Sequence, residues 1–213
     1  IASASAAGGG TVWLRAGTYA ITETIRPMSN VSIIGLVQPI LAFTGYVPDA
    51  QNTPIGGVIF NVSAGVTAMA FNEVDGTFPV DVNLATTALA NITLKNLIFV
   101  GGAKHIDFGA YARLGITYSR IEEIHSYNSS DEALSFDGFQ HCVFKNIYVS
   151  SSVNGYKGGI YFRCSLDSRL LPGNSTIEGE IYTYTTHRLS RSIVFECNGP
   201  LSGAGGYNNT GGQ

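Results

Sequence analysis

The stretch Ile92-Thr-Leu-Lys-Asn-Leu-Ile-Phe99 joins two short apolar segments, Ile92–Leu94 and Leu97–Phe99, through Lys95 and Asn96. Apolar and polar side chains that alternate with a period of two predict β-strands. Asn tolerates the left-handed backbone conformation that a tight corner requires. The stretch therefore predicts a strand, a corner and a second strand.

The same frame recurs along the chain. It fits residues 119–126, 142–149 and, more loosely, 176–183, with corners at Glu122-Glu123, Lys145-Asn146 and Gly179-Glu180. The second strand of each frame belongs to an apolar series with spacings of 25, 38, 27, 23 and 34 residues: Ile34, Ile59, Leu97, Ile124, Ile147 and Ile181.

A further short strand that ends on Phe follows each member of this series. Its spacings of 28, 37, 28, 26 and 33 residues lengthen and shorten with those of the first series. Repeats of this length made of strands predict a solenoid, in which each coil buries its apolar face against its neighbours. The Phe series is Phe43, Phe71, Phe108, Phe136, Phe162 and Phe195.

Length and composition limit the function classes. The 213 residues suit one domain, and 26 Gly with 11 Phe and 11 Tyr suit an all-β fold. A net charge of −3 without a basic cluster argues against a nucleic-acid partner, and no apolar run approaches the ~18 residues of a membrane span. The four His have no metal-ligand spacing, so no metal site is expected. No cofactor is expected either.

We expect residues 1–202 to form one domain of about six coils. The long spacing after Phe71 predicts an insertion loop at residues 72–90. Residues 203–213 are expected to be a flexible Gly-rich tail or the start of a further coil, and the chain is expected to be a fragment of a longer solenoid.

The segment Ala7-Gly-Gly-Gly-Thr-Val-Trp-Leu-Arg-Ala-Gly-Thr-Tyr-Ala-Ile21, followed by Ser29–Gly35, resembles the first coil of the pectate-lyase-like superfamily of right-handed parallel β-helices. That superfamily includes phage tailspike depolymerases, polygalacturonase-type hydrolases and fungal exo-β-1,3-glucanases. Arg15 stands where Pro is usual. The resemblance implies a single-stranded right-handed parallel β-helix whose Phe-centred strands face a substrate groove.

On those strands the residues between the inward apolar pairs are expected to point outward. The resulting acids suit carbohydrate cleavage, which needs one protonated carboxyl group and a second carboxylate. A salt-bridge ladder of Asp137, Arg163 and Glu196 is the alternative interpretation. The candidate catalytic residues are Asp107, Asp131, Glu132 and Asp137, and the candidate substrate-binding residues are His105, Lys157, Tyr161 and Arg163.

Asn128-Ser-Ser-Asp-Glu-Ala-Leu-Ser-Phe136 resembles the polygalacturonase segment in which two Asp precede the groove strand, so Asp131 and Glu132 would take the place of that acid pair. The Gly-His-Gly of that family is here Tyr156-Lys-Gly-Gly159, without His. On the other sheet, His125, Tyr148 and Tyr182 are expected to stack as an outward column that either binds sugar or packs.

Six Asn-X-Ser/Thr sequons favour an extracellular glycoprotein, although Asn, Ser and Thr are also common in turns. Cys164 and Cys197 are expected on neighbouring coils, either as a disulfide or as two thiols. The sequon residues are Asn30, Asn61, Asn91, Asn128, Asn174 and Asn208.

Two functions remain open at this point. The first is an extracellular polysaccharide-degrading enzyme, a glycoside hydrolase or a polysaccharide lyase, with a glycan as its partner. The second is a non-catalytic β-helix in a virion fibre, a surface appendage or an extracellular filament, assembled as a homotrimer or with other copies of itself.

Overall fold

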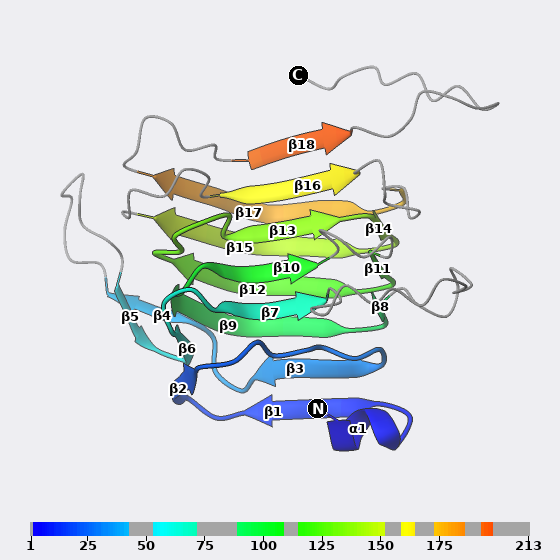
Figure 1. The fold of residues 1–213 in the computed structure, drawn as a ribbon, viewed down its shortest axis with the longest axis horizontal. Helices are drawn as coiled ribbons and strands as arrows, with labels where there is room; N and C mark the ends of the chain where they lie inside the picture. Colours follow the sequence, from blue (N-terminus) through cyan, green and yellow to red (C-terminus); the bar gives the residue numbers. More distant parts are fainter. Residues whose placement is uncertain are drawn as a thin grey trace.

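Parallel strands stacked one above another make up most of the structure. The computed structural model describes residues 2–42, 53–71, 89–108, 115–151, 159–164, 173–185 and 193–197. After a five-residue helix α1 (Ala2–Ala6), all named elements are strands, which lie stacked from β1 at the bottom of Figure 1 to β18 at the top. The fold is therefore all-β with parallel sheets, an arrangement compatible with a β-helix.

The largest sheet has eight strands that run across the back of Figure 1. Its main path is β1-β3-β9-β12-β15-β17; β6 pairs with both β2 and β9, and every pairing is parallel. Its members are β1 (Gly10–Leu14), β2 (Gly17–Ile21), β3 (Val31–Gly35), β6 (Val58–Val62), β9 (Thr93–Gly101), β12 (Arg120–Tyr127), β15 (Val143–Ser151) and β17 (Thr176–Thr185).

The Phe-centred strands form a second parallel sheet with the order β18-β16-β13-β10-β7. Its members are β7 (Thr67–Phe71), β10 (Lys104–Phe108), β13 (Leu134–Asp137), β16 (Ile160–Cys164) and β18 (Ile193–Cys197). Five predicted Phe residues are paired in register along this sheet, namely Phe71, Phe108, Phe136, Phe162 and Phe195.

Two smaller sheets complete the fold. Parallel strands β8 (Leu89–Ala90), β11 (Ile116–Thr117) and β14 (Phe139–Gln140) form one of them. Strands β4 (Ile40–Ala42) and β5 (Thr53–Gly56) pair antiparallel in the other.

The predicted corners are confirmed by the backbone. Asn96, Glu123 and Asn146 have φ of 56°, 52° and 51°, and Gly179 has φ of 73°. Each of these residues lies inside one long strand. The two strands predicted on either side of a corner are therefore continuous and bend at a single residue with a left-handed backbone conformation. Asn146 Nδ2 donates to Glu123 Oε1 at 2.6 Å, and its Oδ1 accepts from the Glu180 backbone N–H at 3.0 Å, so the corners are bonded to one another as well.

The Phe column is buried in its middle and exposed at its end. The rings of Phe108, Phe136 and Phe162 are at most 2% exposed, and successive centroids lie 6.1 and 5.7 Å apart. Phe195 stacks on Phe162 at 5.2 Å but is 68% exposed. The prediction of a fully buried column is thus wrong for Phe195, which lies on the edge strand of the sheet. The side chain of Phe71 lies outside the described residues.

The predicted repeats fail at the N-terminal end. Residues 40–42, expected to form the first Phe-centred strand, pair antiparallel with β5, and Phe43 lies outside the described residues. The segment at Ile25 takes that place, since it bridges to Met69 of β7. In the first apolar series Val58, and not Ile59, is the register partner of Leu97. A shift of one residue exchanges the two faces of a strand, and it is Val58 that is fully buried.

Of the predicted insertion at 72–90, residues 72–88 lie outside the described residues, while Leu89 and Ala90 form β8. The predicted tail at 203–213 also lies outside them.

We predict that Phe136→Ala lowers the free energy of unfolding by roughly 3–5 kcal/mol, because the ring is fully buried against Phe108, Phe144 and Phe162. Phe195→Ala is the matched control, since the same side chain in the same column is mostly exposed and its loss should be clearly smaller. Urea unfolding of both variants measures the difference. Equal losses would show that the column does not stabilise the fold in this way.

Candidate functional site

The second sheet carries polar side chains on the face opposite its apolar column. Ile106 and Phe108 belong to the core, whereas Asp107 between them lies in register with Ser135 of β13 and Tyr161 of β16. Asp137 and Arg163 are register partners two residues further along. The regular pairing of parallel strands thus brings side chains from three repeats onto one face.

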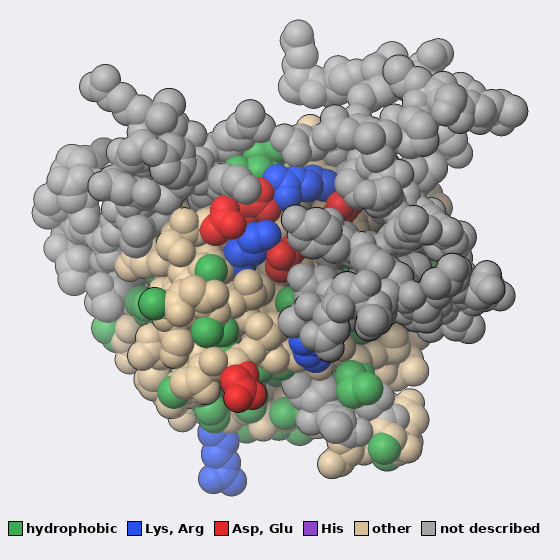
Figure 2. Space-filling model, in the orientation of Figure 1, with side chains coloured by type: hydrophobic (Ala, Val, Ile, Leu, Met, Phe, Trp, Pro, Cys, Tyr) green, Lys and Arg blue, Asp and Glu red, His purple; other side chains and the backbone are tan. Residues whose placement is uncertain are grey.

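Figure 2 shows acidic and basic side chains gathered on this face, over β10, β13 and β16. We call this group the charged cluster. It consists of Lys104, Asp107, Asp131, Glu132, Asp137 and Arg163, with the ring of Tyr161 beside it.

The best-defined contact in the charged cluster joins Glu132 and Arg163. The guanidinium donates two hydrogen bonds of 2.7 Å, one to each carboxylate oxygen. It also lies 4.3 Å from the ring centroid of Tyr161, within range of a cation–π interaction. The Glu132 side chain is 2% exposed and that of Arg163 is 22% exposed. This geometry holds Glu132 as a carboxylate and orients the guanidinium.

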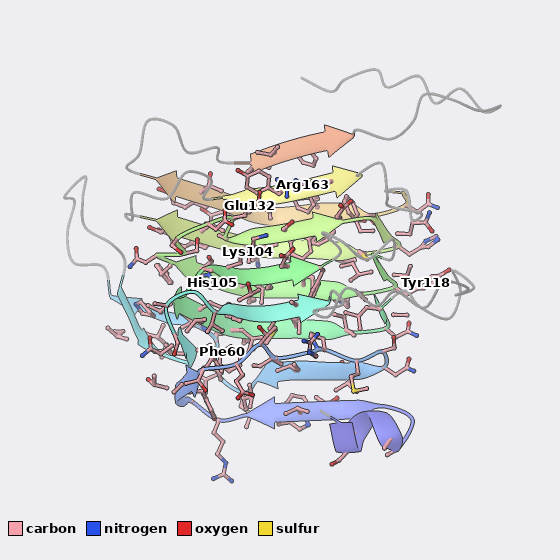
Figure 3. All side chains as sticks on the ribbon, viewed as in Figure 1. Phe60, Lys104, His105, Tyr118, Glu132 and Arg163 are labelled. Atoms are coloured by element: carbon pink, nitrogen blue, oxygen red, sulfur yellow. The ribbon has the colours of Figure 1, made fainter. Side chains whose placement is uncertain are left out.

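Lys104 joins two of the carboxylates. Its Nζ lies 2.9 Å from Asp107 Oδ2 and 3.7 Å from Glu132 Oε2. In Figure 3, Lys104, Glu132 and Arg163 follow one another up the sheet. Burial by itself lowers the pKa of Lys104, but the neighbouring Asp107, Glu132 and Asp131 outweigh it, so the pKa is raised. Lys104 therefore stays charged.

One acceptor of the charged cluster has no hydrogen bond. Oδ1 of Asp107 is buried and has no donor in the described part of the chain. A buried acceptor without a donor costs roughly 1–3 kcal/mol. The described residues therefore satisfy only one of the two carboxylate oxygens of Asp107.

The predicted exposure of this face is wrong. Asp107, Ser135, Tyr161 and Val194 were expected to point into open solvent, but each is at most 9% exposed. Glu132 and Asp137 are also buried, and only Lys104, Asp131 and Arg163 remain partly exposed. Such close pairing of opposite charges permits this burial. Lys157 lies outside the described residues, as does the side chain of Glu196.

His105 does not belong to the charged cluster, contrary to its predicted role in binding substrate. It is fully buried, and its ring stacks on Phe99 with centroids 5.5 Å apart. Nε2 faces the Gly101 carbonyl oxygen at 2.6 Å and therefore carries the hydrogen, while Nδ1 accepts from the Ser126 hydroxyl at 2.6 Å. Burial lowers the pKa of His105 to about 4, so the ring is neutral near pH 7.

The sequon asparagines occupy corners more often than strands. Asn30, Asn91, Asn128 and Asn174 have φ between 48° and 63°, a conformation that Asn tolerates better than most residues. Asn91 Nδ2 also donates to Asn30 Oδ1 at 3.1 Å. Turn chemistry therefore accounts for these four positions. Asn61 lies exposed in β6, and Asn208 lies outside the described residues.

Two other predictions concern stacked side chains. The expected column on the large sheet is confirmed, with His125–Tyr148 and Tyr148–Tyr182 centroids 5.6 and 4.8 Å apart and the rings nearly parallel. The rings stack face to face, which favours packing over sugar binding. Cys164 and Cys197 are register partners, as predicted, but their side chains lie outside the described residues.

Sequence reasoning missed the role of Lys104 and the partner of Arg163. The expected ladder pairs Arg163 with residues of the neighbouring strands, but its guanidinium reaches Glu132 in the turn before β13. A Lys three residues before an Asp in one short strand was the available signal for the Lys104–Asp107 pair. Turn geometry, which repeats do not specify, sets the Glu132–Arg163 contact, whereas Lys104 and Asp107 lie in the same strand β10.

Comparison of this chain with protein-family models, curated proteins and solved structures gave no match. Among the described residues, no group of three or more His, Cys, Asp and Glu is arranged to hold a metal ion, and no helix is long and apolar enough to cross a membrane.

We predict that Arg163→Met lowers the free energy of unfolding by roughly 3–5 kcal/mol, because it leaves Glu132 buried without its main partner. Glu132→Leu should cost a similar amount. The double variant should recover much of the loss, since apolar residues often replace a buried ion pair with little effect. Denaturant unfolding of the four proteins gives the coupling energy, and additive losses would contradict the pairing.

We predict that acid destabilises the protein through His105. Its pKa is near 4 when folded and near 6.5 when unfolded, so below pH 6.5 the unfolded chain binds more protons. Stability is then lost as the pH falls from 6.5 to 4, by on the order of 3 kcal/mol. His105→Gln should lack this contribution. The pKa of His125 is also lowered by burial, but His125 is present in both the wild type and the variant, so its effect cancels in the comparison. Parallel pH profiles of unfolding free energy would contradict the assignment.

Proposed function

We propose that this chain forms a right-handed parallel β-helix of the pectate-lyase-like type and belongs to an extracellular enzyme that degrades a polysaccharide by hydrolysis or elimination. The stacked parallel sheets and the first-coil motif at residues 7–35 support the fold part of this proposal. One fold hosts many functions, so the activity rests on the charged cluster.

The observation that carries the proposal is that four carboxyl groups, two cations and an aromatic ring meet on one sheet face. Glycan cleavage uses two carboxyl groups, one as acid and one as base or nucleophile. Of the four acids Asp131 alone is partly exposed, so it is the one that can reach a glycosidic oxygen as the proton donor. Asp107 suits the second role, because Lys104 holds one oxygen and the other has no donor among the described residues.

Glu132 supports this pair and takes no part as an acid. Its two short hydrogen bonds from Arg163 stabilise the ionised form. This changes the roles expected from the sequence, in which Asp131 and Glu132 act as acid and base, since Asp107 replaces Glu132. Asp137, in register with Arg163, assists, and Tyr161 with Arg163 positions the sugar.

A second candidate is a non-catalytic β-helix in a fibre, appendage or filament. Burial of Asp107, Glu132 and Tyr161 favours it, because a substrate must reach groups that are at most 5% exposed. On this alternative the cluster joins three repeats by buried ion pairs and takes no part in chemistry.

We predict that Asp131→Asn and Asp107→Asn each lower the rate of polysaccharide cleavage by about 10²-fold or more, the contribution typical of a general acid or base. Both changes preserve shape and remove charge. Release of reducing ends and of unsaturated sugars from a polysaccharide panel measures hydrolysis and elimination separately. Glu178→Gln, an exposed acid on β17 of the other sheet, is the control and should keep full activity.

Thermal melting must accompany these assays, because Asp107 also pairs with Lys104. Full activity in both Asn variants would place the chemistry elsewhere. A folded wild-type chain that cleaves nothing on the panel would support the structural alternative instead.

A further inference from the structure

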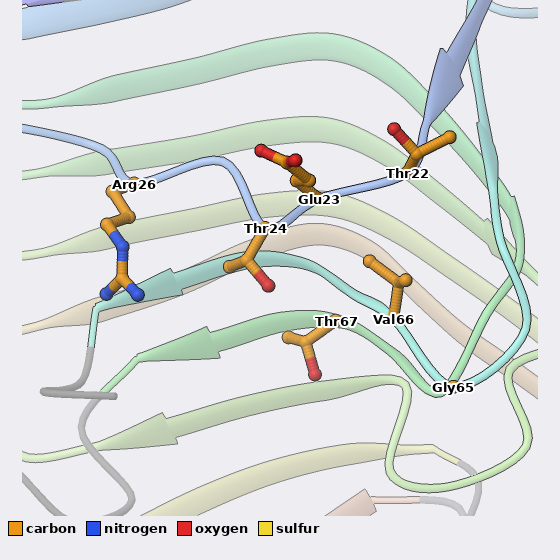
Figure 4. Close-up of a pocket in the computed structure, with 7 residues that line it drawn as sticks. All are labelled: Thr22, Glu23, Thr24, Arg26, Gly65, Val66 and Thr67. Carbon is orange, nitrogen blue, oxygen red and sulfur yellow. The ribbon is translucent and has the colours of Figure 1, made fainter. Parts of the chain in front are cut away.

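A hollow lies next to the charged cluster, between the segment at residues 22–26 and the start of β7. Its volume is about 460 Å³. Figure 4 shows the side chains that line it, among which are three threonines, Thr22, Thr24 and Thr67, together with Glu23 and Arg26. The hollow is thus walled by hydroxyl groups and one group of each charge.

Backbone hydrogen bonds place this hollow in the same sheet as the charged cluster. Ile25 N–H donates to the Ala68 carbonyl oxygen and the Ala70 N–H donates to that of Ile25, so the segment continues the sheet beyond β7. On the other side of β7, Thr67 is the register partner of Lys104. Adjacent strands lie ~4.8 Å apart, so one strand spacing separates the wall of the hollow from the charged cluster.

The turns that precede these strands show the same continuity. Ala103 N–H donates to the Val66 carbonyl oxygen at 2.8 Å, and Asp131 N–H donates to that of Ala103 at 3.0 Å. Val66 lines the hollow. Two strand spacings, ~10 Å, therefore separate the hollow from the proposed acid, a span that one extended chain of sugars covers.

The charges decide which class of glycan suits this surface. The charged cluster has four carboxyl groups against Lys104 and Arg163, and both cations already bind protein carboxylates. In the hollow Glu23 and Arg26 balance each other. The described surface is thus net negative, and the carboxylates of an acidic glycan would meet repulsion there without a spare cation.

Hydroxyl groups suit the hollow better. A threonine hydroxyl both donates and accepts hydrogen bonds, whereas a guanidinium only donates and a carboxylate only accepts. The lining of the hollow can therefore donate hydrogen bonds to sugar hydroxyls and also accept hydrogen bonds from them.

We propose that the hollow is a second sugar-binding site. It holds an uncharged unit of a glycan chain, and the next units of the same chain lie at the charged cluster. This rests on the proposed function and adds the class of substrate, a neutral polysaccharide, and a minimum length that spans both sites. Short fragments would contact only one of them.

Binding of defined glycans tests the proposal, with the Asp131→Asn chain as the parent to prevent turnover. The probes are four neutral polysaccharides (laminarin, mannan, xylan and dextran) and two acidic ones (polygalacturonate and alginate), followed by calorimetry with a disaccharide and a hexasaccharide of the polymer that binds. We expect binding to a neutral polymer and tighter binding of the hexasaccharide.

Thr22→Val with Thr24→Val removes two hydroxyls from the hollow and nearly preserves shape. It should weaken hexasaccharide binding about tenfold and leave disaccharide binding at the charged cluster unchanged. Thr11→Val with Thr18→Val, exposed threonines on β1 and β2, is the matched control and should bind as the parent does.

The outcomes separate the two proposals. Unchanged hexasaccharide binding in the Thr22/Thr24 variant overturns the second site, while the loss of cleavage in Asp107→Asn would still support the enzyme. Preference for polygalacturonate or alginate overturns the neutral substrate. No binding to any of the six polymers overturns both the second site and the proposed function.

Discussion

Parallel pairing between equivalent strands is the constraint on which the rest of this structure depends. Because each strand pairs in register with its counterpart in the next repeat, a residue lies ~4.8 Å from its equivalent. Residues of the same type in successive repeats therefore contact one another. Phe136 lies on Phe162, Tyr148 on Tyr182 and Asn91 against Asn30, each joined by a ring contact or a hydrogen bond. The same rule brings charged side chains of separate repeats into one cluster.

Corners maintain that register. Left-handed residues such as Asn96 and Asn146 turn the backbone within a strand at the same place in each repeat. Their side-chain amides reach neighbouring repeats, as from Asn96 Nδ2 to the Gly35 carbonyl oxygen at 2.9 Å. The requirement for Asn at such positions also explains much of the sequon pattern, which is therefore weak support for glycosylation.

Buried charge sets the chemical possibilities of the second sheet. The ion pairs of Glu132 with Arg163 and of Lys104 with Asp107 hold most of the cluster, and in the described part of the chain Asp107 Oδ1 has no donor. An enzyme and a structural β-helix would both use such pairs. The hollow beside Thr67 extends that surface toward the N-terminal repeats.

The sequence was enough to predict the all-β class, the corners and the stacking of Phe108, Phe136 and Phe162, because apolar spacing and the backbone preferences of Asn and Gly indicate them. It failed at residues 40–42, where an apolar triplet pairs with β5 and not with the Phe strands, since periodicity does not encode the partner. Within the site, the sequence identified the acids and Arg163. The folded chain was needed to show that Glu132 pairs with Arg163, that Asp107 is buried beside Lys104 and that His105 faces the core. The Glu132–Arg163 contact depends on the turn before β13, and the burial of Asp107 and His105 depends on packing against neighbouring repeats, which local spacing does not specify.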